Sequence, residues 1–119
     1  LKPTVDGAFE DMKNLIKSGA YVPHGAVVAD NDTVAIGAVK AIREAGYSIP
    51  EDMSIIGFDD LMICRQMTPQ LTTIAQDLEE KARLSVDILF RRLSAPAAPA
   101  ESLVLDVTLV ERESVAVKR

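Results

Sequence analysis

The stretch Ala26–Asp60 constrains the fold of this chain more than any other part of its sequence. Four apolar residues open it, and the run Asp-Asn-Asp that follows offers three candidate N-caps for a helix. Helical periodicity then continues to Gly46, which favours a helix end, and Pro50 precedes a second apolar run, Met53–Phe58. The order strand, helix, strand predicts a right-handed βαβ unit with parallel strands.

Polar residues follow both predicted strands at the point where each strand ends. Asn31 comes after the first strand and Asp59 after the second. Because parallel strands meet at one carboxyl edge of a sheet, we expect these side chains to lie side by side there. A carboxylate accepts hydrogen bonds and an amide both donates and accepts, so the pair could bind vicinal sugar hydroxyls or a nucleobase edge. The same residues could instead cap the helix and a turn, and spacing alone slightly favours that structural role.

The composition bounds the class of protein. With 119 residues, of which 48% are hydrophobic and 26% charged, the chain has the size of one globular domain at most. A net charge of −5 without a stripe of Lys and Arg argues against nucleic-acid binding by these residues themselves. No apolar run is long enough for a membrane span, and no cofactor or metal motif occurs. The chain opens directly on a predicted helix, so we expect a fragment of a larger α/β protein.

Further elements flank the central unit. Apolar residues at helical spacing predict amphipathic helices at residues 4–18 and 78–93. The short β-branched run at residues 71–75 is predicted as a third strand or a crossing segment. Alternating residues predict another strand at 103–110, after a linker rich in alanine and proline. We expect the charged tail beyond it to fray.

Two apolar features do not fit a simple buried core. Ile36 lies off the apolar stripe of its helix, on the side of Lys40 and Arg43, where it is either singly exposed or a subunit contact. The irregular segment 61–69 is rich in methionine and aliphatic residues, so it is either tucked beneath another element or used as an adaptable contact surface. Together the two features favour a dimer patch. Within the segment, Cys64 is interpreted as a packed thiol, because no histidine partner is evident.

Three blocks of this sequence resemble the C-terminal part of the lactose-repressor and galactose-repressor (LacI/GalR) family of bacterial transcription regulators. The blocks are ADNDTVAIGAVKAIREAGYSIPEDMSIIGFDD, then TPQLTTIAQD, and near the end LVERES. They occur in order and at proper spacing, and they cover nearly all of the chain. Members of that family carry a helix-turn-helix headpiece and a two-lobed core similar to periplasmic sugar-binding proteins. The resemblance implies an α/β, parallel-sheet, Rossmann-like lobe of a type I periplasmic-binding-protein-like fold, without enzymatic activity or a cofactor.

The resemblance also implies roles for particular residues. Asn31 and Asp59 match positions that hydrogen-bond effector hydroxyls, and Gln76 matches a crossing-segment position near the cleft. The positions that match the family's dimerisation surface are Ile36, Lys40, Ile63, Gln66 and Met67. Leu78 stands where relatives place a larger pocket side chain, which leaves the shape of the effector open.

The same resemblance divides the chain and predicts its partners. Residues 1–75 correspond to the C-terminal lobe, 76–102 to a crossing segment and a helix associated with the N-terminal lobe, and 103–119 to a return strand and tail. We expect the effector-sensing and dimerisation part of a cytoplasmic regulator, which forms homodimers, binds a sugar-like or nucleoside-like molecule and reaches operator DNA through a headpiece outside this sequence. No membrane contact is expected.

Two rival functions share parts of this pattern. A periplasmic sugar-binding protein of a transporter has the same fold and cleft, but it is exported and usually monomeric. An α/β enzyme could instead hold Mg²⁺ at the strand end, since Asp59 and Asp60 offer hard oxygen ligands.

Overall fold

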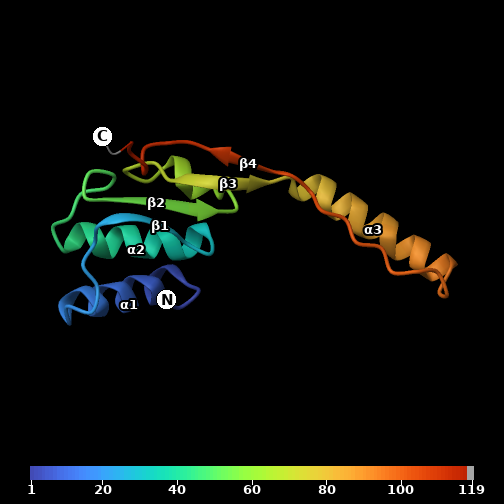
Figure 1. The fold of residues 1–119 in the computed structure, drawn as a ribbon, viewed down its shortest axis with the longest axis horizontal. Coiled ribbons are helices and arrows are strands. Elements are labelled where there is room, and N and C mark those ends of the chain that lie inside the picture. Colours follow the sequence, from blue (N-terminus) through green and yellow to red (C-terminus); the bar gives the residue numbers. More distant parts are fainter. Residues whose placement is uncertain (118–119) are drawn as a thin grey trace. The chain divides into compact units, whose positions relative to one another are not determined.

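The computed structural model describes residues 1–117, in which helices and strands alternate (Figure 1). In chain order the elements are α1 (Val5–Lys17), β1 (Gly25–Val28), α2 (Asp32–Glu44), β2 (Met53–Phe58), the 3-10 helix η1 (Met62–Arg65), β3 (Thr72–Gln76), α3 (Leu78–Ser94) and β4 (Val107–Val110). The strands form a four-stranded sheet in the order β1-β2-β3-β4, and β1, β2 and β3 run parallel. The predicted α/β class and its parallel βαβ unit are confirmed.

The chain divides into two compact units, and each is described by itself. The first unit contains residues 1–75 and the C-terminal segment from Leu109 onward, and the second contains Gln76–Thr108. The second unit therefore holds α3 and also residues 103–108, which the sequence had grouped with the tail.

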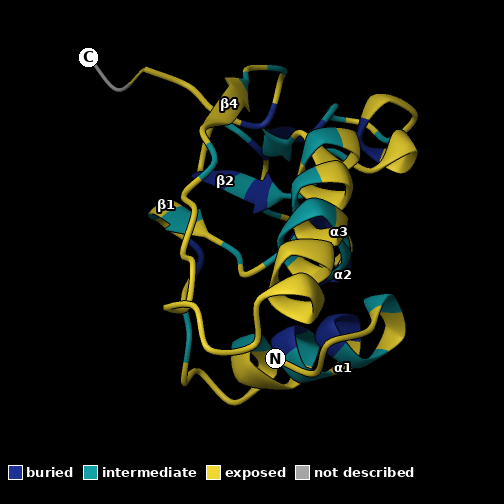
Figure 2. Ribbon diagram, turned by 90° about the vertical axis from the view of Figure 1, so that its right-hand side faces the viewer, coloured by how far each residue is buried: buried dark blue, intermediate teal, exposed yellow. Residues whose placement is uncertain are grey.

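The core of the first unit is built around α2, which lies between the sheet and α1 (Figures 1 and 2). Phe9 and Met12 of α1 join a buried cluster with Ile42 of α2 and with Met53 and Ile55 of β2. The sequence predicted one stripe on this helix, facing the sheet. The structure buries Gly37 and Ala41 in addition, and it exposes Ala45 at the end of the helix. The second buried side exists because α1 covers it.

Close approach of α1 and α2 depends on a glycine. A Cβ at Gly37 would lie 2.7 Å from the Cβ of Ala8 and 2.8 Å from the backbone nitrogen of Phe9. Contacts that short are excluded by van der Waals repulsion, so any larger residue would push the two helices apart.

The tail does not fray over residues 111–116, contrary to the prediction. Ser114 is fully buried, and its hydroxyl donates to the Ile55 carbonyl at 2.6 Å and accepts from the Thr72 backbone N–H at 2.8 Å. The Ile55 N–H in turn donates to the Ser114 carbonyl at 2.9 Å. The tail is held because it satisfies backbone groups of β2 and β3 that would otherwise be buried without partners. Residues 118–119 lie outside the described part of the chain.

The two elements of the C-terminal third are less buried than their patterns suggest. The predicted strand at 103–110 is wrong in its first half: β4 begins at Val107, because β3, the strand beside it, ends at Gln76. The helix α3 forms as predicted, but none of its residues is buried, and Figure 2 colours it only teal and yellow. Leu93, at the end of its apolar stripe, is 67% exposed. Nothing in residues 1–117 covers this stripe.

Candidate functional site

Asn31 and Asp59 leave the sheet at the same edge, as predicted. The strands β1 and β2 pair in parallel with Val28 opposite Ile56, so the residues that follow each strand lie at the carboxyl edge. Asn31 is also the N-cap of α2, because its Oδ1 accepts a hydrogen bond from the Val34 N–H at 2.9 Å. Asn31 therefore caps the helix, which is the structural role that its spacing in the sequence favoured. Its Nδ2 donates no hydrogen bond within the part of the chain that the structure describes, so this group can serve a ligand.

Asp59 begins a turn whose backbone has an unusual conformation. The φ angles of Asp59 and Asp60 are +116° and +54°, in the left-handed region that few non-glycine residues adopt. The Asp59 N–H donates to the Ile74 carbonyl at 2.8 Å, which continues the bonding between β2 and β3 one residue past Phe58. The turn thus reverses the chain immediately at the strand end and leaves the Asp59 side chain half-buried at the edge.

Asp60 is committed to ion pairs within the first unit. Its Oδ1 accepts from the Arg112 Nη2 at 2.6 Å, and its Oδ2 lies 3.7 Å from the Arg65 Nη2. The Arg112 side chain is only 9% exposed and also donates to the Leu71 carbonyl at 2.8 Å. Two guanidinium groups on one carboxylate disfavour a bound cation. Among the described residues no group of three or more His, Cys, Asp and Glu could hold a metal ion.

Asp32 is a buried part of this edge that the sequence analysis treated only as a candidate cap. It has no exposed surface. Its Oδ1 accepts from the Thr73 hydroxyl at 2.5 Å, and its Oδ2 accepts from the Leu61 N–H at 2.8 Å and the Cys64 thiol at 3.1 Å. Gly57 makes room for it, since a Cβ at that position would collide with the Asp32 Oδ1. A short polar residue after a strand is typical of a helix cap, so the local sequence does not distinguish a buried hydrogen-bond acceptor such as Asp32 from an ordinary cap.

Cys64 is a packed thiol, as predicted. Its pKa is raised from 9.0 to about 12, mainly by burial and secondly by the hydrogen bond to Asp32. The thiol therefore stays protonated near neutral pH and donates to the carboxylate, which makes it a poor nucleophile.

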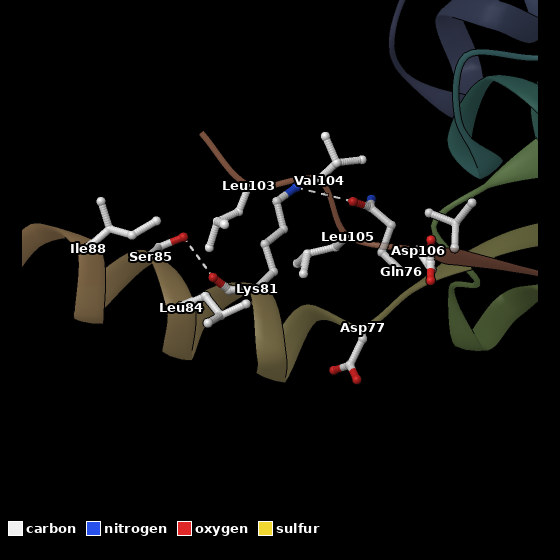
Figure 3. Close-up of a pocket in the computed structure, with 11 residues that line it drawn as sticks. Gln76, Asp77, Lys81, Leu84, Ser85, Ile88, Leu103, Val104, Leu105 and Asp106 are labelled. Carbon is white, nitrogen blue, oxygen red and sulfur yellow. Dashed lines mark hydrogen bonds between the residues drawn. The ribbon is translucent and has the colours of Figure 1, made fainter. Parts of the chain in front are cut away.

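Gln76 lies in the second unit, where it is the last residue of β3. Its Oε1 accepts from the Lys81 Nζ at 3.1 Å, and Figure 3 shows the two side chains beside a hollow between α3 and the segment 103–107. The hollow has a volume of about 390 Å³. Most of its lining is apolar, and those residues include Leu84, Ile88, Leu103, Val104 and Leu105. Gln76 thus has a cationic neighbour, Lys81, at the rim of a hollow that is otherwise largely apolar, and its role as a ligand contact stays a prediction.

The residues matched to the dimerisation surface are brought together in part. Ile36, Lys40 and Met67 line one shallow surface hollow. Ile36 is half-buried and packs against the edge of the core, so it is not the singly exposed residue that was one alternative. Ile63 and Gln66 are exposed on and just after η1, outside this hollow. The apolar segment 61–69 therefore has one side buried, at Cys64, and one side exposed, and its use as a contact surface stays a prediction.

No helix in residues 1–117 is both long enough and apolar enough to cross a membrane.

A parallel α/β sheet with polar residues at its carboxyl edge is the arrangement of an open α/β ligand-binding lobe. Residues 2–115 match the family described as periplasmic binding protein-like domain. The ribose operon repressor of Haemophilus influenzae is 42% identical over 76% of this chain and 27% of its own length.

Two solved structures extend the likeness. A LacI family transcriptional regulator from Enterococcus faecium with bound ribose is 36% identical, with a TM-score of 0.77 over 95% of this chain and 41% of its own. The lac repressor dimer bound to operator and the anti-inducer ONPF is 32% identical, with a TM-score of 0.82 over 96% of this chain and 39% of its own.

The chain belongs to the periplasmic-binding-protein-like family, in the form found in the effector-binding domain of LacI/GalR regulators. It spans about a third of the length of the curated relatives it matches. These relatives are transcriptional repressors and not enzymes.

Proposed function

We propose that this chain is the effector-sensing and dimerisation part of a LacI/GalR-family repressor whose DNA binding changes when a sugar binds. The observation that carries the proposal is the placement of Asn31 and Asp59 after neighbouring parallel strands, at one edge of the sheet. In open α/β sheets this edge is where ligands bind. A sugar held there favours one conformation of the regulator to the extent that it binds that conformation more tightly.

The ligand we propose is a pentose, with ribose as the first candidate. The chain is 42% identical to a ribose operon repressor, and two similar regulators of known structure hold ribose. The chemistry agrees, because the Asp59 carboxylate can accept hydrogen bonds from two adjacent hydroxyls while the Asn31 Nδ2 donates to a third oxygen. Gln76 is proposed as a further sugar contact on the strength of the family position that it matches.

The remaining roles follow from the same family. We propose that residues 1–75 form the C-terminal lobe, 76–102 the crossing segment with its helix, and 103–119 the return strand and tail. Ile36, Lys40, Ile63, Gln66 and Met67 contribute to a homodimer, as the lac repressor bound to operator is a dimer. Such a regulator works in the cytoplasm, where its operator lies, and touches DNA through a headpiece.

The test is a titration of the full-length protein that contains this chain. Ribose, with lactose as the comparison sugar, is titrated by calorimetry, and operator binding is followed by fluorescence anisotropy with and without sugar. We expect ribose to bind and to change operator affinity. Asp59→Asn removes an acceptor for hydroxyls, so it should weaken ribose binding about tenfold or more with little loss of thermal stability.

Three results would contradict this proposal. Operator affinity could be indifferent to both sugars, or Asp59→Asn could bind ribose as tightly as the wild type. A cleavable signal peptide at the start of the full-length protein, in place of a headpiece, would favour the exported sugar-binding protein instead.

A further inference from the structure

A buried hydrogen-bond network joins the turn at Asp59 to the N-terminus of α2. Its centre is the Asp32 carboxylate, the residue next to Asn31, which accepts bonds from the Thr73 hydroxyl, the Leu61 N–H and the Cys64 thiol. The donors come from β3, from the turn and from η1. One side chain therefore fixes three segments against the start of one helix.

Thr73 extends the network into the turn itself. Its hydroxyl donates to Asp32 at 2.5 Å, and the same oxygen accepts from the Asp60 N–H at 3.4 Å. Two consecutive backbone N–H groups of the turn are thus held, that of Asp60 by the Thr73 hydroxyl and that of Leu61 by Asp32. Asp59 lies immediately before the held pair, so its position depends on these bonds.

The cost of this arrangement indicates that it serves more than stability. A fully buried carboxylate is expensive to desolvate, and here all three donors are neutral groups. Apolar side chains of similar volume would fill such a site at least as stably. What they could not do is accept the Leu61 N–H and the Thr73 hydroxyl, and so hold a turn whose φ angles are otherwise disfavoured.

We propose that Asp32 is a positioning residue for effector binding: it holds the turn that carries Asp59 in place beside Asn31. This inference rests on the proposed function, in which Asn31 and Asp59 contact the sugar. The Asp32 side chain has no exposed surface through which a ligand could contact it. It acts through the backbone at residues 60–61 and through Thr73.

The experiment compares Asp32→Asn, Thr73→Val and Thr73→Ser in the full-length protein. Asparagine brings an N–H₂ group to face donors, and valine removes the hydroxyl that links Asp32 to Asp60. Serine keeps that hydroxyl and should restore the network. Met12→Ala is the matched control, because it opens a core cavity on α1 and destabilises the protein without touching the turn.

Ribose affinity is measured by calorimetry well below the melting temperature of every variant. We expect Asp32→Asn and Thr73→Val to raise the ribose Kd about tenfold, while Thr73→Ser and Met12→Ala stay near the wild-type value. Amide hydrogen exchange at Leu61 should accelerate in Asp32→Asn and not in Met12→Ala, since only the former replaces the charged, two-oxygen acceptor of that N–H by a single neutral amide oxygen. A purely structural role would lower the melting temperature and leave the Kd unchanged.

The outcomes separate this inference from the proposed function. A wild-type protein that binds ribose, together with a Thr73→Val variant that binds it equally well, overturns the positioning role and leaves the function standing. A Met12→Ala variant that loses as much affinity as Thr73→Val overturns it too, because the effect would then follow stability alone. Failure of the wild type to bind any sugar overturns the proposed function, and this inference with it. If Asp32→Asn does not fold, the pair Thr73→Val and Thr73→Ser still decides.

Discussion

At the scale of single residues, the buried thiol of Cys64 couples the free energy of unfolding to pH. Burial and the bond to Asp32 raise its pKa from 9.0 to about 12 in the folded protein. Because the folded pKa lies above the unfolded one, the contribution of the protonated thiol is complete below pH 9 and is lost as the pH rises from 9 toward 12. At a pH of about 10.5 the loss is about 2 kcal/mol.

Urea unfolding of the wild type and Cys64→Ser, under reducing conditions at pH values of about 8 and about 10.5, measures this loss. Serine keeps a donor for Asp32 but does not ionise in this range. The wild type should lose about 2 kcal/mol more than the variant between the two pH values. Equal losses would show that the thiol ionises as readily in the folded state as in the unfolded one.

Residue roles were predictable where they follow from strand geometry alone. Parallel pairing places Asn31 and Asp59 at one edge whatever the rest of the fold does. The role of Asp32 depends on Thr73 and Cys64, which lie 41 and 32 positions away in the sequence. No local sequence pattern reveals contacts with residues so far away, so from the sequence Asp32 can only be predicted as another candidate helix cap.

At the scale of elements, the C-terminal tail stabilises the sheet through Ser114. Replacing it by alanine leaves the Thr72 N–H and the Ile55 carbonyl buried without that hydroxyl, which should cost about 1–3 kcal/mol. Ser85→Ala is the matched control, because Ser85 is exposed and bonds only its own helix, so its effect should stay within about 0.5 kcal/mol. Urea unfolding measures both. If Ser114→Ala is as neutral as the control, the tail contributes nothing and the expectation of fraying stands.

Elements were predicted well wherever local chemistry decides their ends. The residues just before helices α1, α2 and α3 are Thr4, Asn31 and Asp77, and each caps its helix through a side-chain oxygen. The end of the chain was predicted poorly because its contacts are distant: β4 starts where β3 is available, and the tail is held by strands about 40 to 60 positions earlier. The exposure of α3 could not be predicted either, because an apolar stripe in the sequence does not show whether another element covers it.

At the scale of the whole molecule, α2 carries residues of both proposed surfaces, the one for the ligand and the one for the dimer. It carries Asn31 at its N-cap and Ile36 and Lys40 in its following turns. The Asp32 network ties the same end of the helix to η1, beside which the other proposed dimer residues lie. A shift of α2 on sugar binding would therefore be felt at the dimer surface without any separate relay.

The dimer surface is tested by Ile36→Glu in the full-length protein. The hollow lined by Ile36, Lys40 and Met67 is partly apolar, so a buried carboxylate there should raise the dimer dissociation constant about tenfold or more, as measured by sedimentation equilibrium. Val22→Glu is the control, because Val22 is an exposed apolar residue in the loop before β1. Since Ile36 also packs on the edge of the core, some loss of stability is expected, but the helical circular dichroism signal should remain. Loss of that signal, or a dimer as tight as that of Val22→Glu, would mean that Ile36 serves the core alone and that the dimer forms through another face.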